Sequence, residues 1–144
     1  MVAVTIMLDI AFHAGSQRIV NASDLAQRLG LARRGMEPLL QALSRAGLLD
    51  SLRGPRGGYR LGRPAREIRV SEIVAVVLAD GEARPAPGEG PGGRLQAEVV
   101  DPLWAEVDAA AASVLEGLSL DDLLKRAASA GLRRVAAMPI SFAI

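Results

Sequence analysis

The sequence predicts a mainly α-helical fold in which three helices and a two-stranded β-hairpin are followed by a long helix. Three observations support this prediction. Half of the 144 residues are apolar and few are aromatic, so the core is aliphatic and its alanines and leucines favour helix. Apolar residues recur at helical spacing in several segments. One short stretch rich in glycine and proline separates two segments that are typical of strands.

The first two helices are predicted from residues 2–14 and 21–30. Residues 2–14 carry apolar side chains on almost every side, which is typical of a largely buried helix that ends at Gly15. The second segment, "NASDLAQRLG", begins with Asn21, a residue type that caps helix N-termini, and ends at Gly30.

A third helix is predicted over residues 31–49, with a stop signal at Gly47. Apolar side chains recur in it at helical spacing: Met36, Leu39, Leu40 and Leu43. Pro38 is comfortable only in the first turn of a helix, because its missing N–H has no partner there. Two alternatives follow: the regular helix begins near Arg34, or the helix is distorted at its start.

The stretch "LRGPRGGYRL", residues 52–61, joins two predicted strands through a turn and carries three arginines. A loop that needs only to turn uses Asn, Asp, Ser or Gly, so this positive charge indicates contact with a negative partner. Helix, short turn, helix and then a hairpin with a basic tip is the order of a winged helix-turn-helix, in which the hairpin is called the wing.

The sequence after the hairpin predicts a fourth helix over residues 70–79, with Ser71 as N-cap, and then a Gly/Pro-rich loop over residues 81–94. A long amphipathic helix follows from about Leu95 to Gly117. Pro102 within it marks either a kink or the real start of the helix.

A short helix is predicted over residues 119–127, which open with the Ser-x-x-Asp pattern of a capping box. The apolar tail "MPISFAI" that ends the chain is expected to pack on the body.

The charges are divided between the two halves of the chain. Residues 1–69 hold eleven arginines against five acidic residues, a net charge of +6, whereas residues 70–144 hold six basic against eleven acidic residues, a net charge of −5. This asymmetry is expected when one end of a protein meets a polyanion.

Composition excludes several classes of protein. The chain has no cysteine, which excludes disulfides, thiolate zinc sites and cysteine-ligated iron–sulfur clusters. With one histidine and no phosphate-loop or dinucleotide motif, it is not expected to be an enzyme. No signal peptide and no apolar run of about 18 residues is present, so we expect a soluble cytoplasmic protein with no membrane partner.

Two pairs of residues share a helix face at a spacing that suits metal ligands, namely Asp9 with His13 and Glu98 with Asp101. The first pair is better explained by a histidine at a helix end and the second by solvated carboxylates. No metal site is therefore predicted.

The pattern resembles one family closely, the IscR-like winged-helix transcription regulators of the Rrf2 family, over about residues 3–126. The resemblance is carried by "AVTIMLDIAFHA", "LAQRLGL" and, most specifically, "AGLLDSLRGPRGGYRL" at residues 46–61. Downstream, "IRVSEIVAVV" and "PLWAEV" follow in the same order.

The resemblance implies a homodimer that binds operator DNA, with the third helix in the major groove and the wing along or in the minor groove. It implies DNA contacts at seven residues: Arg33, Arg34, Gly35, Glu37, Arg53, Arg56 and Arg60. The long helix is expected to pair with its twin through its apolar stripe: Val99, Leu103, Trp104, Val107, Val114 and Leu115. The implied domains are 1–80 for DNA binding, 81–94 as a loop, and 95–144 for dimerisation with the short helix and the tail.

Individual side chains have chemically distinct options on DNA. Arg33 and Arg34 bond either guanine or phosphate. Glu37 either accepts from cytosine N4 or pairs with a neighbouring arginine. Arg53 is the candidate for a narrow minor groove, which attracts arginine.

Three features depart from the family pattern. The chain starts almost inside the first helix, where relatives usually have a short basic segment. The Gly/Pro-rich region holds none of the three cysteines of iron–sulfur members, so no cluster and no other cofactor is expected. Gly35 and Pro38 stand where relatives more often have a bulky and a polar residue, so the preferred DNA sequence should differ.

The sequence thus predicts a homodimeric, sequence-specific DNA-binding regulator that represses transcription without an iron–sulfur cluster. Its activity would change through a small-molecule effector, through a protein partner, or not at all. The alternative is a protein-interaction module derived from a winged helix, which docks a metabolic enzyme and binds DNA weakly or not at all.

Overall fold

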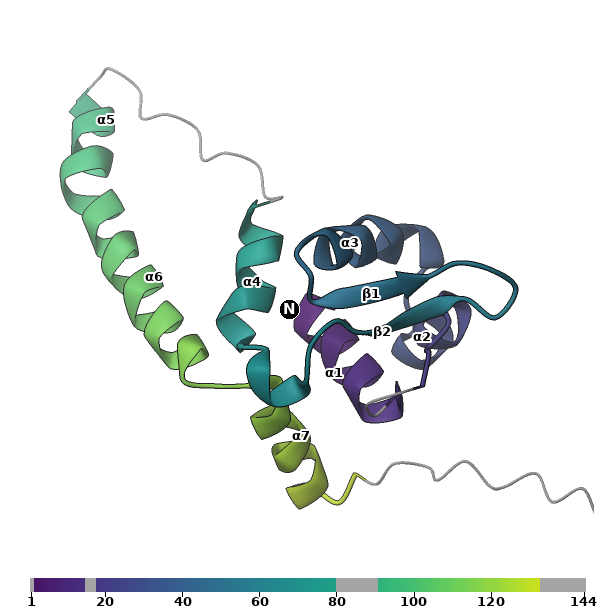
Figure 1. Cartoon of the computed structure of the whole chain (residues 1–144). Coiled ribbons are helices and arrows are strands. Elements are labelled where there is room, and N and C mark those ends of the chain that lie inside the picture. Colours follow the sequence, from purple (N-terminus) through teal and green to yellow (C-terminus); the bar gives the residue numbers. More distant parts are fainter. Residues whose placement is uncertain (1, 15–17, 80–90, 133–144) are drawn as a thin grey trace, which may run out of the picture.

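The computed structural model describes residues 2–14, 18–79 and 91–132 (Figure 1). Its elements are α1 (Val2–Ala14), α2 (Ala22–Leu29), α3 (Arg33–Arg45), β1 (Leu49–Leu52), β2 (Gly58–Leu61), the 3₁₀ turn η1 (Ala65–Glu67), α4 (Val70–Ala79), α5 (Pro91–Leu95), the π-helical turn η2 (Gln96–Val100), α6 (Asp101–Glu116) and α7 (Leu120–Ser129). The winged helix-turn-helix is confirmed, and α5, η2 and α6 form a long helix that stands to one side of it. No described helix is long and apolar enough to cross a membrane.

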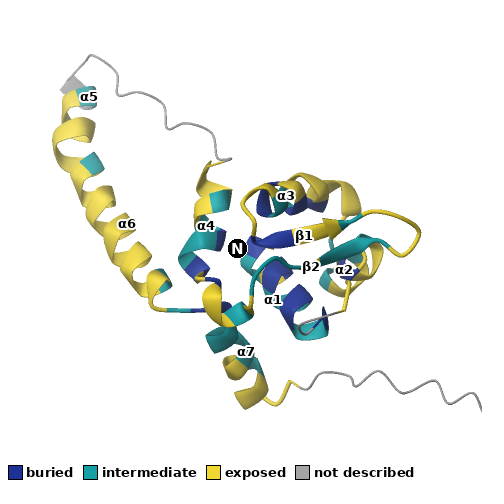
Figure 2. Ribbon diagram, viewed as in Figure 1, coloured by how far each residue is buried: buried dark blue, intermediate teal, exposed yellow. Residues whose placement is uncertain are grey.

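Helix α1 is the centre of the hydrophobic core, as its nearly uniform apolar sequence predicts (Figure 2). It is buried along its whole length at Ala3, Ile6, Met7, Ile10, Ala11 and Ala14. Side chains from the other elements of the body join it in one cluster: Leu25, Met36, Leu40, Leu43, Leu49, Ile73 and Leu120. The predicted end at Gly15 lies outside the described residues.

Local capping defines α2. The Asn21 side chain accepts a hydrogen bond from the Asp24 N–H at 2.8 Å, and Gly30 closes the helix at a φ of 64°. This left-handed conformation favours glycine, which has no Cβ to clash. The predicted caps of this helix are therefore confirmed.

Helix α3 is shorter than the predicted range of 31–49. It ends at Arg45 because Gly47 adopts a φ of 73° and reverses the chain, so that Leu49 begins strand β1. It starts at Arg33, close to one of the two predicted alternatives, and continues through Pro38 in its second turn. Pro38 is exposed and has no N–H, so the Arg34 carbonyl receives no hydrogen bond from it.

The wing is a two-stranded sheet, to which an isolated bridge adds Val20. Strands β1 and β2 pair in antiparallel register, with Ser51 opposite Tyr59. On the other side of β2, Tyr59 and Val20 exchange two backbone hydrogen bonds of 2.8 Å each. Gly58 makes this approach possible, because a Cβ there would lie 2.4 Å from the Val20 carbonyl oxygen. The start of α2 is thereby tied to the wing.

Helix α4 begins at Val70, so Ser71 is its second residue and the prediction of Ser71 as N-cap is wrong. One local and one long-range hydrogen bond fix the start. Glu72 Oε2 accepts from the Arg69 N–H at 2.9 Å, and the Val70 N–H donates to the Leu118 carbonyl at 2.9 Å.

The long helix begins earlier than predicted, because α5 starts at Pro91 and positions 91–94 of the predicted loop are helical. Proline at the first helical position costs no hydrogen bond. The π-helical turn η2 widens the backbone before Pro102, which is then the second residue of α6. Pro102 therefore marks the start of the regular segment within a longer helix.

The capping box of α7 is present with both of its bonds. Ser119 Oγ accepts from the Asp122 N–H at 3.1 Å, and Asp122 Oδ2 accepts from the Ser119 N–H at 2.9 Å. The helix continues to Ser129, slightly beyond the predicted end. The apolar tail lies outside the described residues.

Candidate nucleic-acid interface

The first candidate surface combines the start of α3 with the tip of the wing. Both lie on the side of the molecule away from α6 (Figure 1). Their relative position is held by the pairing of Val20 with Tyr59 and by the short connection between α2 and α3.

At the start of α3, one arginine has no acidic partner among the described residues, and the helix backbone at Gly35 is not covered by other groups. Arg33 Nε lies 3.6 Å from Glu37 Oε1, so these two predicted DNA residues pair with each other. Arg34 is exposed, and its side chain forms no hydrogen bond or ion pair with any other described residue. At Gly35 an added Cβ would meet nothing within 4 Å, so this part of the helix surface is open to close approach.

The tip of the wing carries two more unpaired arginines. Arg53 and Arg56 are exposed and have no acidic partner in the part of the chain that the structure describes. Gly54 adopts a φ of 115°, a conformation that favours glycine, and its carbonyl accepts from the Gly57 N–H at 2.9 Å. The tight turn therefore projects positive charge that none of the described acidic groups neutralises.

Arg60 differs from the other two wing arginines. It lies opposite Asp50 in the register, and its Nη2 is 3.2 Å from Asp50 Oδ2. Tyr59 and Leu61 pack toward the core, so the Arg60–Asp50 pair occupies the outer face of the hairpin. The charge of Arg60 is thus balanced within the hairpin.

The structure adds Gln41 to the residues predicted for this surface. Gln41 is exposed on α3, one turn after Glu37 and two turns after Arg34. A glutamine amide can form two hydrogen bonds with adenine in the major groove. Its helical spacing from Arg34 is a signal by which sequence reasoning could have found it.

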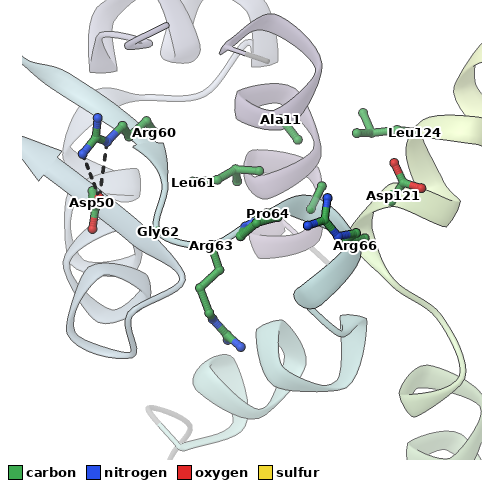
Figure 3. Close-up of a pocket in the computed structure, with 11 residues that line it drawn as sticks. Ala11, Asp50, Arg60, Leu61, Gly62, Arg63, Pro64, Arg66, Asp121 and Leu124 are labelled. Carbon is green, nitrogen blue, oxygen red and sulfur yellow. Dashed lines mark hydrogen bonds and ion pairs between the residues drawn. The ribbon is translucent and has the colours of Figure 1, made fainter. Parts of the chain in front are cut away.

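An open cleft of ≈ 740 Å³ lies at the base of the wing, between β2, η1, α1 and α7 (Figure 3). Its charged lining residues are Asp50, Arg60, Arg63, Arg66 and Asp121. The guanidinium groups do not converge, because Arg60 binds Asp50 and Arg63 points away toward α4. There Arg63 Nη2 donates to Glu72 Oε1 at 2.7 Å.

Glu72 joins the segment after the wing to α4. Its carboxylate accepts hydrogen bonds from the Arg69 backbone and from the Arg63 side chain, and these bonds hold its pKa below the ordinary value of 4.5. Because both donors precede α4 and follow the wing, this carboxylate fixes how the wing leads into the rest of the fold.

Asp9 performs a similar task between α1 and α2. Both of its carboxylate oxygens accept from Arg28 Nε at 3.1 Å, and this hydrogen bonding raises the pKa of Arg28. His13 Nε2 lies 3.5 Å from the same carboxylate. Asp9 therefore serves an ion pair that orients α2, and no group of three or more metal-ligating side chains occurs among the described residues.

The second candidate surface is the long helix. None of the α6 residues is buried, and the apolar side chains along it are largely open to solvent (Figure 2). The predicted stripe is exposed by 46–65% at five positions: Val99, Leu103, Trp104, Val107 and Val114. The sixth predicted residue, Leu115, is half-buried within its own chain. An apolar face of this length is typical of a surface that a partner covers.

Known proteins share this arrangement. The chain is 34% identical over 123 residues to the HTH-type transcriptional regulator IscR of Vibrio campbellii, a match that covers 85% of this chain and 73% of the relative. It is 37% identical over 123 residues to the IscR of Aliivibrio salmonicida, covering 85% and 72% of the two chains.

Solved structures with the same fold include T. potens IscR, with a TM-score of 0.69, 32% identity, and coverage of 90% of this chain and 85% of that one. CymR (YrzC), the global cysteine regulator of B. subtilis, superposes with a TM-score of 0.62 at 29% identity, covering 87% and 92%. The family model of Rrf2, described as an iron-dependent transcriptional regulator, matches residues 1–126. The wing and the exposed arginines at the start of α3 agree with this match. The chain therefore belongs to the Rrf2 family of DNA-binding transcription regulators.

Proposed function

We propose that this protein is a homodimer that binds operator DNA sequence-specifically and represses transcription without an iron–sulfur cluster. The observation that carries the proposal is the group of exposed arginines without described partners, Arg34 on α3 and Arg53 and Arg56 on the wing, at the end of the molecule away from α6. Charged groups that the protein leaves unpaired are available to phosphates and base edges.

The two elements have different tasks on DNA. Helix α3 enters the major groove, where Arg34 and Gln41 contact base edges and Gly35 allows close approach of the helix backbone. Arg33 lies 3.6 Å from Glu37, a looser pair than the 3.2 Å contact of Arg60 with Asp50, so Arg33 can still contact a phosphate. The wing follows the minor groove, where Arg56 binds phosphate and Arg53 reaches inward. Arg60 contributes least, because Asp50 balances its charge.

Two copies of the chain pair through their long helices around a two-fold axis. The support is the exposed stripe of α5–α6, which includes Leu103 at 57% and Val99 at 60% exposure. An interface that makes the dimer obligate buries more than about 2,000 Å² in total. In domain terms, residues 1–80 bind DNA, residues 81–94 connect, and residues 95–144 comprise the long dimerisation helix, the short helix and the apolar tail.

The residues of this chain do not suit an iron–sulfur cluster. Cysteine thiolates hold the iron–sulfur clusters of proteins, and none of the 144 residues is cysteine. Glu98, one of the carboxylates in the corresponding region, is bonded to Arg94 at 3.3 Å. Anaerobic incubation with iron and sulfide is therefore expected to leave no stoichiometric iron on the protein and no change in its DNA affinity. Stoichiometric iron and sulfide would contradict the proposal.

Repression follows from occupancy of a promoter, which needs only a dimer that binds its site tightly. A small-molecule effector would act through the cleft at the wing base, whose ≈ 740 Å³ lies within the size range of small-molecule sites. A ligand there would contact β2 and η1, and would thereby shift the wing relative to α7.

The decisive experiment is selection of bound DNA from random fragments by the purified protein, with and without cell extract. Enrichment of a two-fold symmetric sequence, lost in Arg34→Ala, supports the proposal. Absence of any enriched sequence supports the alternative of a protein-interaction module that docks an enzyme. Transcription in vitro from a promoter that contains the selected sequence then tests repression, and activation would contradict it.

A further inference from the structure

An apolar groove lies between α1, α2 and the end of α7, on elements that neither the DNA-binding residues nor the dimer stripe use. Its volume is ≈ 230 Å³, and it is lined by Thr5, Leu8, Asp9, Phe12, Leu29, Ala127 and Leu132. Among the described lining residues Asp9 alone is charged, and Arg28 already neutralises it. The groove therefore offers apolar surface large enough for one or two bulky side chains.

The end of α7 directs the chain to this groove. Gly131 adopts a φ of 80°, and the Leu132 N–H donates back to the Ala127 carbonyl at 3.1 Å, which is the pattern of a Schellman turn. The turn places Leu132 on the rim of the groove, where it is 61% exposed. The last described residue of the chain thus lies at the groove.

The sequence after Leu132 includes a segment apolar enough to fill the groove. After Arg133 and Arg134, residues 135–144 read "VAAMPISFAI", in which Ser141 is the one polar residue. A segment of this length reaches about 33 Å when extended, which is more than enough to cross the groove. Such a segment gains free energy by leaving water, and the groove is the apolar surface next to its point of attachment.

We propose that residues 135–144 dock in the groove of their own chain and fasten α7 to α1 and α2. The docked tail covers Leu8, Phe12, Leu29 and Leu132 and holds α2, the first helix of the helix-turn-helix, against α1 and α7. This proposal concerns the fold of one chain and does not depend on the operator or on the dimer.

The first test compares the full chain with a chain that ends at Leu132. Removal of the tail is expected to lower Tm by about 5 °C or more, and to speed hydrogen exchange in α1 and α2 but not in the wing. In the full chain, Phe142→Asp should reproduce this loss, whereas Ser141→Asp, at the polar position of the tail, should not. An unchanged Tm and unchanged exchange in both the truncated chain and Phe142→Asp would overturn the proposal.

The second test uses the absence of cysteine from the chain. Ala127→Cys and Phe142→Cys together are expected to form a disulfide within one chain, which non-reducing gels show as a monomer of altered mobility. A covalent dimer in place of this band would show that the tail docks on a second copy, and would overturn the assignment to its own chain. Ala127→Cys combined with Ala75→Cys on α4 is the matched control, which should not form the bond.

Discussion

Substitution of Arg56 by alanine should flatten the salt dependence of DNA binding. Arg56 is exposed at the wing tip, and none of the described acidic groups pairs with it. Each phosphate contact releases condensed counterions, so that log K falls with log salt by about 0.9 per contact. A symmetric dimer has two wings, and Arg56→Ala therefore lowers the slope by about 1.8.

This change in slope is large enough to measure. From about 50 to about 200 mM salt, a difference of about 1.8 in slope means that the parent loses about 12-fold more affinity than the variant. The assay is fluorescence anisotropy of operator and random duplexes at four salt concentrations. Because a phosphate contact carries no sequence information, Arg56→Ala should weaken both duplexes similarly at low salt.

Three further variants make the result specific. Arg126→Ala on α7 removes the same charge away from the wing and should leave the slope unchanged. Arg60→Ala should change it less than Arg56→Ala, because Asp50 balances that guanidinium at 3.2 Å. Arg53→Ala should cost more affinity on A·T-rich than on G·C-rich operators. If Arg53→Ala and Arg56→Ala bind both duplexes like the parent at every salt concentration, the wing does not contact DNA.

Three other predictions test the rest of the molecule. Leu103→Glu should raise the dimer dissociation constant by about 100-fold or more, since each dimer carries the change twice. Ala112→Glu, on the opposite side of α6, is the control and should leave the dissociation constant unchanged. Light scattering at micromolar concentration shows whether each variant is a dimer or a monomer. Ser44→Ala should raise the free energy of unfolding by about 0.5–1 kcal/mol in urea titrations, because the Ser44 hydroxyl is buried without a partner among the described residues; a loss of stability would refute this. Glu72→Gln should lower Tm at neutral pH. The lowered pKa of Glu72 means that its ionised form stabilises the fold above pH 4.5, and that this stability is lost as pH falls through the folded-state pKa. The difference in Tm from the parent should therefore shrink in acid, and a constant difference would show that the charge of Glu72 has no part in it.

Much of the fold is predictable from the sequence because its signals act within one helical turn. Asn21 and Gly30 bound α2, and the bonds between Ser119 and Asp122 start α7, all through groups three or four residues apart. The exposed arginines of the wing are predictable for the same reason, since a tight Gly/Pro turn has no interior in which to bury them.

Groups far apart in the sequence decided the rest. Arg60 was predicted as a DNA residue like its neighbours, but the cross-strand register places it against Asp50 and balances its charge. Helix α4 starts at Val70 and not after Ser71, because the Leu118 carbonyl, far along the chain, accepts a hydrogen bond from the Val70 N–H. Such partners become neighbours only when the chain folds. The sequence by itself therefore determined which segments are helix, strand and turn, whereas the tertiary structure decided which charges remain free to meet DNA.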